Sequence, residues 1–181
     1  MLSVRPLQHS DIPLFLKYWF ESDETFLEGM GLDVSKLPSK EQFTSMLEKL
    51  LVTPIEQRMS YAVVWLKDEE PIGHSNTNPT TFGEEAKMHL HIWSDTERKK
   101  GMGTELVKMT LPHYFSTLQL KTLWCEPYAL NPAPNKTLEK VGFEFIKEHV
   151  TVPGVFNFEQ PVKQWRMTRE RFDQLSRQFN S

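Results

Sequence analysis

One short stretch of the chain combines residue types that bind phosphate groups. It holds three basic residues followed by two glycines, namely Arg98, Lys99, Lys100, Gly101 and Gly103. Residues 87–93 before it alternate as a strand does, and helical periodicity begins after Met102. A strand that ends in a glycine-bearing turn and opens a helix directs backbone N–H groups, and the positive end of the helix dipole, at one point. The stretch therefore predicts an anion site, most naturally for phosphate, formed by the backbone amides of Gly101, Met102, Gly103 and Thr104.

Two common phosphate-binding motifs do not fit this spacing. The P-loop requires Gly-x-x-x-x-Gly-Lys-Ser/Thr, which the sequence lacks. The dinucleotide fingerprint requires a third glycine three residues after the second, where Leu106 stands. The pattern Arg-x-x-Gly-x-Gly is by itself also compatible with a solvated surface turn, so the rest of the chain must decide between the two interpretations.

Two histidines are the candidates for acid–base chemistry. His89 and His91 share one face of the predicted strand with Lys87 and Trp93, because side chains alternate with a period of two. The unperturbed pKa of histidine lies near neutral pH, so either ring could accept a proton from an amine, and either could equally be a structural or surface histidine. His74 and His113 are expected to be bystanders. The single cysteine, Cys125, lies among apolar residues, where burial raises the pKa of a thiol, and it is not predicted to be a nucleophile.

Length and composition limit the class of protein. A chain of 181 residues with 39% hydrophobic content is long enough for one packed domain, which we expect to span residues 1–181. The net charge of −3 argues against a nucleic-acid-binding protein. The sequence has no apolar run of membrane-spanning length and no signal peptide, and one cysteine excludes an intrachain disulfide or a cysteine-based metal cluster. We expect a soluble, cytoplasmic protein without a metal, as a monomer or homodimer.

The periodicity predicts the order strand, two helices, three antiparallel strands, helix, strand, helix, two strands and a final helix. The strands are expected at residues 2–5, 61–66, 72–76, 87–93, 122–125, 143–150 and 162–168. Ser10 should cap the first helix, and Ser39 with Gln42 should form a capping box on the second. Asn131 and Gly142 should bound the helix after the fifth strand, and Pro112 should kink or end the one before it. Residues 21–38 are expected to be irregular. Hairpins mixed with crossovers give an α+β class around a mixed sheet.

This order and two motifs resemble the GNAT superfamily of N-acetyltransferases. Arg98, Gly101 and Gly103 match the superfamily's acetyl-CoA pyrophosphate loop, Gln/Arg-x-x-Gly-x-Gly/Ala. Residues 131–143 are similar to its segment Asn-x-x-Ser/Ala-x-x-x-x-Glu-Lys-x-Gly-Phe, and the matching residues are Asn131, Glu139, Lys140, Gly142 and Phe143. Asn135 and the Glu139–Lys140 pair are most similar to the ribosomal-protein N-terminal (alanine/serine) acetyltransferases. The resemblance implies a central mixed, mostly antiparallel sheet flanked by helices.

The resemblance also implies an activity and a cofactor site. The activity is transfer of an acetyl group from acetyl-CoA to a primary amine, by direct attack in a ternary complex. The end of the 87–93 strand should diverge from the 122–125 strand and pair with the pantetheine arm, and the face that carries His89 and His91 should line the acceptor channel. The implied cofactor-binding residues are Ile92, Trp93, Ser94, Arg98, Lys99, Lys100, Gly101, Met102, Gly103, Thr104, Asn131 and Asn135.

The sequence departs from the family at the expected general acid. Many GNAT enzymes have a tyrosine where Leu138 stands, and others use a serine where Pro134 stands. Tyr128 is the nearest substitute, and the rival interpretation is a non-catalytic acyl-CoA-binding module. The acceptor could be a protein N-terminus or a small amine such as a polyamine or aminoglycoside. Four acidic residues in the 21–38 segment, Asp23, Glu24, Glu28 and Asp33, would favour a cationic acceptor if they lined its channel, or could simply be solvated.

Overall fold

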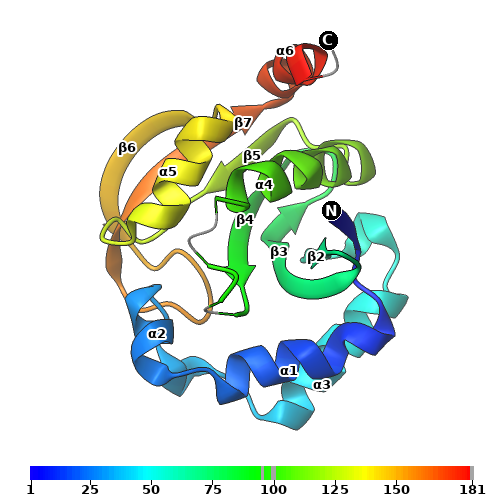
Figure 1. Cartoon of the computed structure of the whole chain (residues 1–181), viewed down its shortest axis with the longest axis vertical. Helices are drawn as coiled ribbons and strands as arrows, with labels where there is room; N and C mark the ends of the chain where they lie inside the picture. The colour runs from blue at the N-terminus through cyan, green and yellow to red at the C-terminus, as the bar shows by residue number, and fades with distance from the viewer. Residues whose placement is uncertain (95, 99–100, 180–181) are drawn as a thin grey trace.

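A computed structural model describes residues 1–94, 96–98 and 101–179. Its core is a seven-stranded sheet in the spatial order β1-β2-β3-β4-β5-β7-β6 (Figure 1). The strands are β1 (Leu2–Pro6), β2 (Tyr61–Lys67), β3 (Glu70–Thr81), β4 (Glu85–Ile92), β5 (Thr122–Cys125), β6 (Glu144–Thr151) and β7 (Gln160–Thr168). The β4–β5 pair is parallel and the other five pairs are antiparallel. The predicted class, a mixed and mostly antiparallel sheet flanked by helices, is therefore confirmed.

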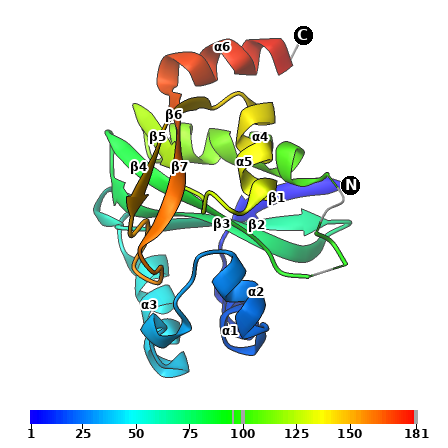
Figure 2. The same cartoon turned by 90° about the vertical axis from the view of Figure 1, so that its left-hand side faces the viewer.

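Helices cover both faces of the sheet, as Figure 2 shows. One face carries α1 (Ile12–Glu21), α2 (Glu24–Gly29) and α3 (Lys40–Val52), and the other carries α4 (Gly103–Pro112) and α5 (Pro132–Val141). The last helix, α6 (Arg169–Phe179), follows β7. Within the described residues, no helix has both the length and the apolar composition needed to cross a membrane.

Strand β2 supplies both hydrophobic cores by simple alternation. Val63 and Trp65 point to the core under α4 and α5, while Ala62, Val64 and Leu66 point to the core under α1 and α3. A half-buried strand shows one apolar face, whereas Tyr61 to Leu66 are all buried because helices lie on both sides. The strand thus holds two helical layers at fixed positions relative to one sheet.

The predicted helix ends agree with the structure at three places. Ser39 and Gln42 form the expected capping box at the start of α3. Asn131 is the N-cap residue of α5, and Gly142 follows the helix with a φ of 105°, the left-handed conformation that glycine adopts without strain. At Pro112 the α-helix ends and continues as a π-turn over His113–Thr117, which satisfies the prediction of a break.

The prediction that residues 21–38 are irregular is wrong. The segment contains α2 and a short 3₁₀ helix, Val34–Lys36. Asp23 accepts a hydrogen bond from the backbone N–H of Phe26, and Asp33 accepts one from that of Ser35, so each carboxylate caps a short helix. A helix of six residues is too short for its apolar periodicity to be recognised in the sequence.

Candidate functional site

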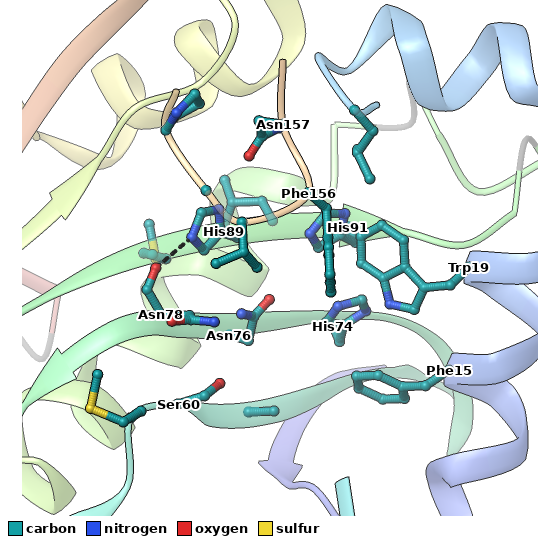
Figure 3. Close-up of a pocket in the computed structure, with 18 of the residues that line it drawn as sticks. Phe15, Trp19, Ser60, His74, Asn76, Asn78, His89, His91, Phe156 and Asn157 are labelled. Atoms are coloured by element: carbon teal, nitrogen blue, oxygen red, sulfur yellow. Dashed lines mark hydrogen bonds between the residues drawn. The ribbon is translucent and has the colours of Figure 1, made fainter. Parts of the chain in front are cut away.

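The candidate site is a cavity of about 510 Å³ between the sheet and the α1–α3 layer. Strands β3 and β4 form its floor, α1 and α3 form its side, and residues 153–157 of the β6–β7 loop cover it (Figure 3). His74 and Asn76 on β3 lie opposite His91 and His89 on β4, because the antiparallel register pairs them. The predicted face of β4 therefore lines a cavity, and the register adds a second row of polar side chains from β3.

His89 is oriented by a main-chain carbonyl. Its Nε2 lies 2.9 Å from the carbonyl oxygen of Asn78, where a β-bulge shifts the β3–β4 register (Figure 3). A carbonyl oxygen only accepts hydrogen bonds, so Nε2 carries the hydrogen and Nδ1 is the nitrogen that can take a proton. Burial lowers the pKa of His89, while the Asn78 carbonyl and the charge of Glu126 oppose that shift.

His91 belongs to an aromatic cluster instead. Its ring stacks on that of His74 with centroids 4.6 Å apart, and its Nδ1 lies 3.2 Å from the hydroxyl of Tyr18. Burial, with a smaller contribution from His89, lowers the pKa of His91 to about 3, although part of the ring faces the cavity. His91 is therefore neutral at physiological pH and is a weaker base than His89.

His74, which we expected to be a bystander, is part of the cavity wall. Its side chain is almost fully buried, and its Nδ1 accepts a hydrogen bond of 2.7 Å from the indole Nε1 of Trp93. Burial lowers the pKa of His74 well below its usual value, and the neighbouring histidines add to that shift. The two-residue alternation on β4 could not reveal His74, because the residue lies on the adjacent strand.

Glu126 is a site residue that the sequence analysis missed. Its Oε1 lies 2.7 Å from Nζ of Lys87 and its Oε2 lies 3.2 Å from Nε2 of His149, and only 6% of its side chain is exposed. It directly follows β5, on the same face as Lys87 and His89, and lines the cavity. A single glutamate after a buried strand carries no motif, so the sequence offered no signal for it.

The strands β4 and β5 diverge beside these residues. Their parallel register ends at Met88 and Cys125, whereas β4 continues to Ile92. The N–H of Trp93 donates to the Ile72 carbonyl on β3, and antiparallel pairing alternates, so the backbone groups of Leu90 and Ile92 face the open side. The predicted divergence is present, and Leu90 joins Ile92 there as a residue that the sequence analysis did not name.

Arg98 ties the loop after β4 to the end of that strand. Its Nε donates to the carbonyl of Ile92 over 3.0 Å, and its Nη2 donates to the carbonyl of Trp93 over 3.2 Å. The guanidinium also lies 3.4 Å from the ring centroid of Phe26 on α2. Both backbone groups of Trp93 and the carbonyl of Ile92 are thus engaged within the protein, so the pantetheine arm must use the N–H of Ile92 or the backbone of Leu90.

The glycine loop leads into α4 as predicted. Gly101 has a φ of 75°, Met102 is the N-cap residue, and Gly103 starts the helix. A Cβ on Gly103 would lie 3.3 Å from Oγ1 of Thr137 on α5, so this glycine also permits close helix packing. The first amides of the helix, including that of Thr104, have no intrahelical acceptor. Lys99 and Lys100 lie outside the described residues, and Ser94 precedes this loop with its Oγ 2.7 Å from Oγ1 of Thr96.

The loop between β5 and α5 lies on the other side of the gap where β4 and β5 diverge. Asn131 and Tyr128 line the cavity, and the side chain of Asn131 makes no capping hydrogen bond to α5. Asn135 is buried instead, with Nδ2 donating to the carbonyls of Tyr128 and Asn131 and Oδ1 accepting from Nε1 of Trp165. Asn135 therefore fixes the loop that presents Asn131.

Several other candidates lie away from the cavity or are inert within it. None of Asp23, Glu24, Glu28 and Asp33 lines the cavity, whereas Met30 and Leu32 of the same segment do, so of the two interpretations left open for these carboxylates the structure favours the one outside the acceptor channel. Burial raises the pKa of the Cys125 thiol, as expected for a side chain that is not a nucleophile. The described residues include no group of three or more His, Cys, Asp or Glu arranged to hold a metal ion.

Comparison with known proteins identifies the architecture. The family model described as "Acetyltransferase (GNAT) domain" matches residues 2–144. A search of curated proteins gave no match. A spermidine N-acetyltransferase from Vibrio cholerae, solved with CoA and spermine, superposes with a TM-score of 0.76 at 16% identity, covering 94% of this chain and 97% of that one.

Two further solved structures share the fold. An aminoglycoside acetyltransferase in complex with coenzyme A has a TM-score of 0.71 at 17% identity, covering 96% of this chain and 98% of that one. A ribosomal L7/L12 α-N-protein acetyltransferase in complex with coenzyme A has a TM-score of 0.75 at 13% identity, covering 94% of this chain and 95% of that one. Identities this low establish the fold alone, and the three structures differ in the acceptor that their descriptions name.

Proposed function

This chain belongs to the GNAT acetyltransferase family, and from that premise we propose that it is an acetyl-CoA-dependent N-acetyltransferase. It transfers the acetyl group to a primary amine by direct attack in a ternary complex. The observation that carries the proposal is that one cavity joins the divergence of β4 and β5, at Met88 and Cys125, to the imidazole of His89. A thioester lying in the divergence would meet an amine lying in the cavity, and holding two reactants in register is a large part of catalysis.

The proposed cofactor site uses backbone groups throughout. The pyrophosphate lies against the amides of Gly101, Met102, Gly103 and Thr104, where the dipole of α4 favours negative charge. The pantetheine arm pairs with the outward-facing backbone of Leu90 and with the N–H of Ile92, whose carbonyl already accepts from Arg98, and Asn131 lies on the other side. In this assignment Arg98 and Asn135 position the two walls, Ser94 borders the loop, and Lys99 and Lys100 add positive charge near the phosphates.

His89 is the proposed general base. Its Nδ1 takes a proton from the substrate ammonium, directly or through water, and the freed lone pair attacks the thioester carbonyl carbon. The resulting oxyanion is stabilised by a backbone N–H of Leu90 or Ile92, and its collapse breaks the C–S bond. The coenzyme A thiolate then takes a proton from Tyr128, the nearest hydroxyl candidate on the β5–α5 loop, or from water, and the second proton of the attacking nitrogen passes through water to restore that donor. His91, with its low pKa, shapes the acceptor pocket.

The acceptor class is a separate part of the proposal. The three structural relatives acetylate a polyamine, an aminoglycoside and a protein N-terminus by their descriptions, and the ribosomal-protein branch is one candidate among these. We further propose that the chain acts as one domain, in the cytoplasm, as a monomer or homodimer.

The second candidate is a non-catalytic acyl-CoA-binding module. Leu138 and Pro134 favour it, because they replace the hydroxyl-bearing residues that many GNAT enzymes use as general acid. A binding module would bind acetyl-CoA without releasing coenzyme A when amines are added.

The deciding experiment measures coenzyme A release with a panel of amines for the wild type and two variants. We expect His89→Gln to lower kcat by about 10²–10⁴-fold, the usual contribution of a general base, with little change in acetyl-CoA affinity. His91→Gln should change the KM for the amine more than kcat. The pH inflection of kcat/KM that belongs to His89 should disappear in its variant. No turnover with any amine, despite acetyl-CoA binding, would support the binding module instead.

A further inference from the structure

The acceptor end of the cavity is walled by aromatic rings. This aromatic wall consists of Phe15, Trp19, His74, His91 and Phe156, which Figure 3 labels, together with Phe43 on α3. The rings contact one another, with centroid distances of 4.3 Å for Phe15–His74, 4.9 Å for Trp19–His91 and 6.2 Å for Trp19–Phe156. Most of these pairs are tilted or edge-to-face, so neighbouring rings cover much of each ring face. The parts of the rings that remain open to the cavity are apolar, and an acceptor would contact this apolar surface.

The two histidines of the aromatic wall add no charge. Burial lowers the pKa of both His74 and His91, and His74 is almost fully buried. Both rings are neutral at physiological pH and behave as flat, weakly polar surfaces. An acceptor that reaches this wall meets an environment of low dielectric constant, where each additional charge on the acceptor would be costly to desolvate.

Carboxylates, which a polycation needs, are scarce around the cavity. Among the described residues that line it, Glu126 is the one carboxylate, and Lys87 and His149 already contact its two oxygens. Lys49 and Arg58 also line the cavity and bring positive charge. One ammonium at the reacting end could lie near Glu126, whereas a second or third would lie unpaired near cations.

The polar groups of the cavity are suited to neutral partners. Asn76, Asn157 and Gln160 line it with uncharged amides. The Nε2 of Gln160 donates to the carbonyls of Gly31 and Phe158, over 2.7 Å and 3.0 Å, which fixes the orientation of its amide. Its Oε1 is buried and has no hydrogen-bond partner in the structure. That oxygen lies against Gly31 and is not exposed to the cavity, so the amides that can offer hydrogen bonds to a neutral group of an acceptor are those of Asn76 and Asn157.

The mouth of the cavity is apolar as well. Met46 on α3, Met59 and Val155 all line it and are 51%, 65% and 65% exposed. Flexible thioether side chains adapt to varied apolar shapes. These residues extend the apolar surface from the aromatic wall to solvent, in the direction that the distal part of an acceptor would take.

From this arrangement we infer that the acceptor is a primary amine with a single positive charge, carried on an aromatic or long aliphatic body. Polyamines and aminoglycosides, which carry several ammonium groups, are poor acceptors. The inference rests on the proposed function, because it names the substrate class of the same site. A small apolar amine and the N-terminus of a peptide with an apolar first residue share this chemistry.

The test compares amines that differ in one charge. Hexylamine and 1,6-diaminohexane have the same length, and the second carries one additional ammonium at the far end. We expect kcat/KM for hexylamine to exceed that for the diamine by on the order of 10²-fold, since an ammonium group without a counter-charge is costly to desolvate against apolar surface. Phenethylamine should be accepted and spermidine should not. A short peptide with an N-terminal phenylalanine, with and without an acetylated N-terminus, distinguishes the peptide source from the small-amine source.

A negative charge added at the mouth of the cavity tests whether the scarcity of carboxylates causes the preference for a singly charged amine. Met46→Glu adds a carboxylate to the exposed rim of the cavity and should narrow the preference for hexylamine over the diamine by about two- to fivefold, the usual range for a partly exposed charge pair. Met109→Glu is the matched control, because Met109 is similarly exposed, at 40%, but lies on α4 and does not line the cavity. It should leave the ratio unchanged.

Equilibrium binding of the same amines to the coenzyme A complex distinguishes a failure of the proposed acceptor class from a failure of the proposed acetyltransferase activity. Turnover with equal or better use of the diamine and spermidine overturns the substrate class and leaves the acetyltransferase proposal standing. Selective binding of hexylamine without turnover shows that the cavity prefers ligands with a single charge, and it overturns the enzymatic proposal and with it the role of these amines as substrates. Binding and turnover of none of these amines overturns the substrate class.

Discussion

The Nε of Arg98 donates to the main-chain carbonyl of Ile92 over 3.0 Å, so a residue of the predicted phosphate-binding motif holds the end of the strand that precedes it. The second hydrogen bond, from Nη2 to Trp93, and the contact with Phe26 fix the same guanidinium from two further directions. The arginine of the motif therefore connects β4, α2 and the glycine loop. Its effect on cofactor binding should be largely geometric.

Replacing Arg98 tests this role. Arg98→Gln should weaken acetyl-CoA binding by about 10-fold, because hydrogen bonds from a charged donor each contribute about 1.5–3 kcal/mol and their loss releases the strand end. Calorimetric titrations at low and high salt should give the same fold loss, since a geometric effect is not screened. Lys67→Gln is the control: it removes the positive charge that pairs with Glu97 on the same loop but contacts no carbonyl of β4. A loss for Arg98→Gln that shrinks steeply with salt would indicate a direct phosphate contact instead.

Gly101 can be compared with Gly83, a glycine of the same φ. Gly101 and Gly83 both have a φ of 75°, and among the described residues a Cβ on either would meet no heavy atom within 4 Å. Alanine at each position should therefore cost a similar amount of stability, about 1 kcal/mol, through backbone strain alone. Gly101→Ala should also lower acetyl-CoA affinity at least about 10-fold, because the added methyl group occupies the approach of the pyrophosphate. Equal affinities for the two variants in calorimetry would remove the phosphate site from this loop.

The Glu126–Lys87 pair should matter for stability more than surface pairs do. Glu126→Gln leaves the shape unchanged but leaves Lys87 without its counter-charge, and we expect urea unfolding to show a loss of about 1–3 kcal/mol. Adding Lys87→Met should recover part of that loss. The control is Glu144→Gln, which breaks an exposed pair with Arg166 and should change stability by less than about 1 kcal/mol. Losses of the same size for the two single variants would argue against a tightly coupled pair at the cavity.

The buried histidines predict the direction of the pH dependence of folding. The folded-state pKa of His91 is about 3, below its unfolded value of about 6.5, so the unfolded chain binds more protons between these values. The stability contributed by the neutral ring is complete above pH 6.5 and is lost as the pH falls toward 3. At pH 5 the loss from His91 alone should be about 2 kcal/mol. Urea unfolding at pH 7.5 and pH 5.0 should show a smaller difference for His91→Gln than for the wild type. His9→Gln, at an exposed histidine, should leave the difference unchanged.

Much of the fold could be predicted because its signals are local. The capping box at Ser39 and Gln42 and the left-handed glycine at Gly142 depend on residues within one turn of a helix. The strand at Thr122–Cys125 was placed correctly from a short apolar run bounded by turn residues. The glycine loop before α4 could likewise be predicted, because a position with positive φ, such as Gly101, favours glycine.

The amino-acid sequence by itself determined the order of the strands and of every helix of the described residues except α2 and the short 3₁₀ helices, because periodicity and caps act between near neighbours. It also determined the glycine loop and the face of β4 that carries His89 and His91. Tertiary structure alone decided which distant groups meet. The antiparallel register stacks His74 on His91, and the parallel pairing of β4 with β5 brings Glu126 to Lys87. It also decided that Met30 and Leu32, rather than nearby carboxylates, face the cavity. These contacts depend on packing between segments far apart in the chain, and no local pattern of residue types encodes that packing.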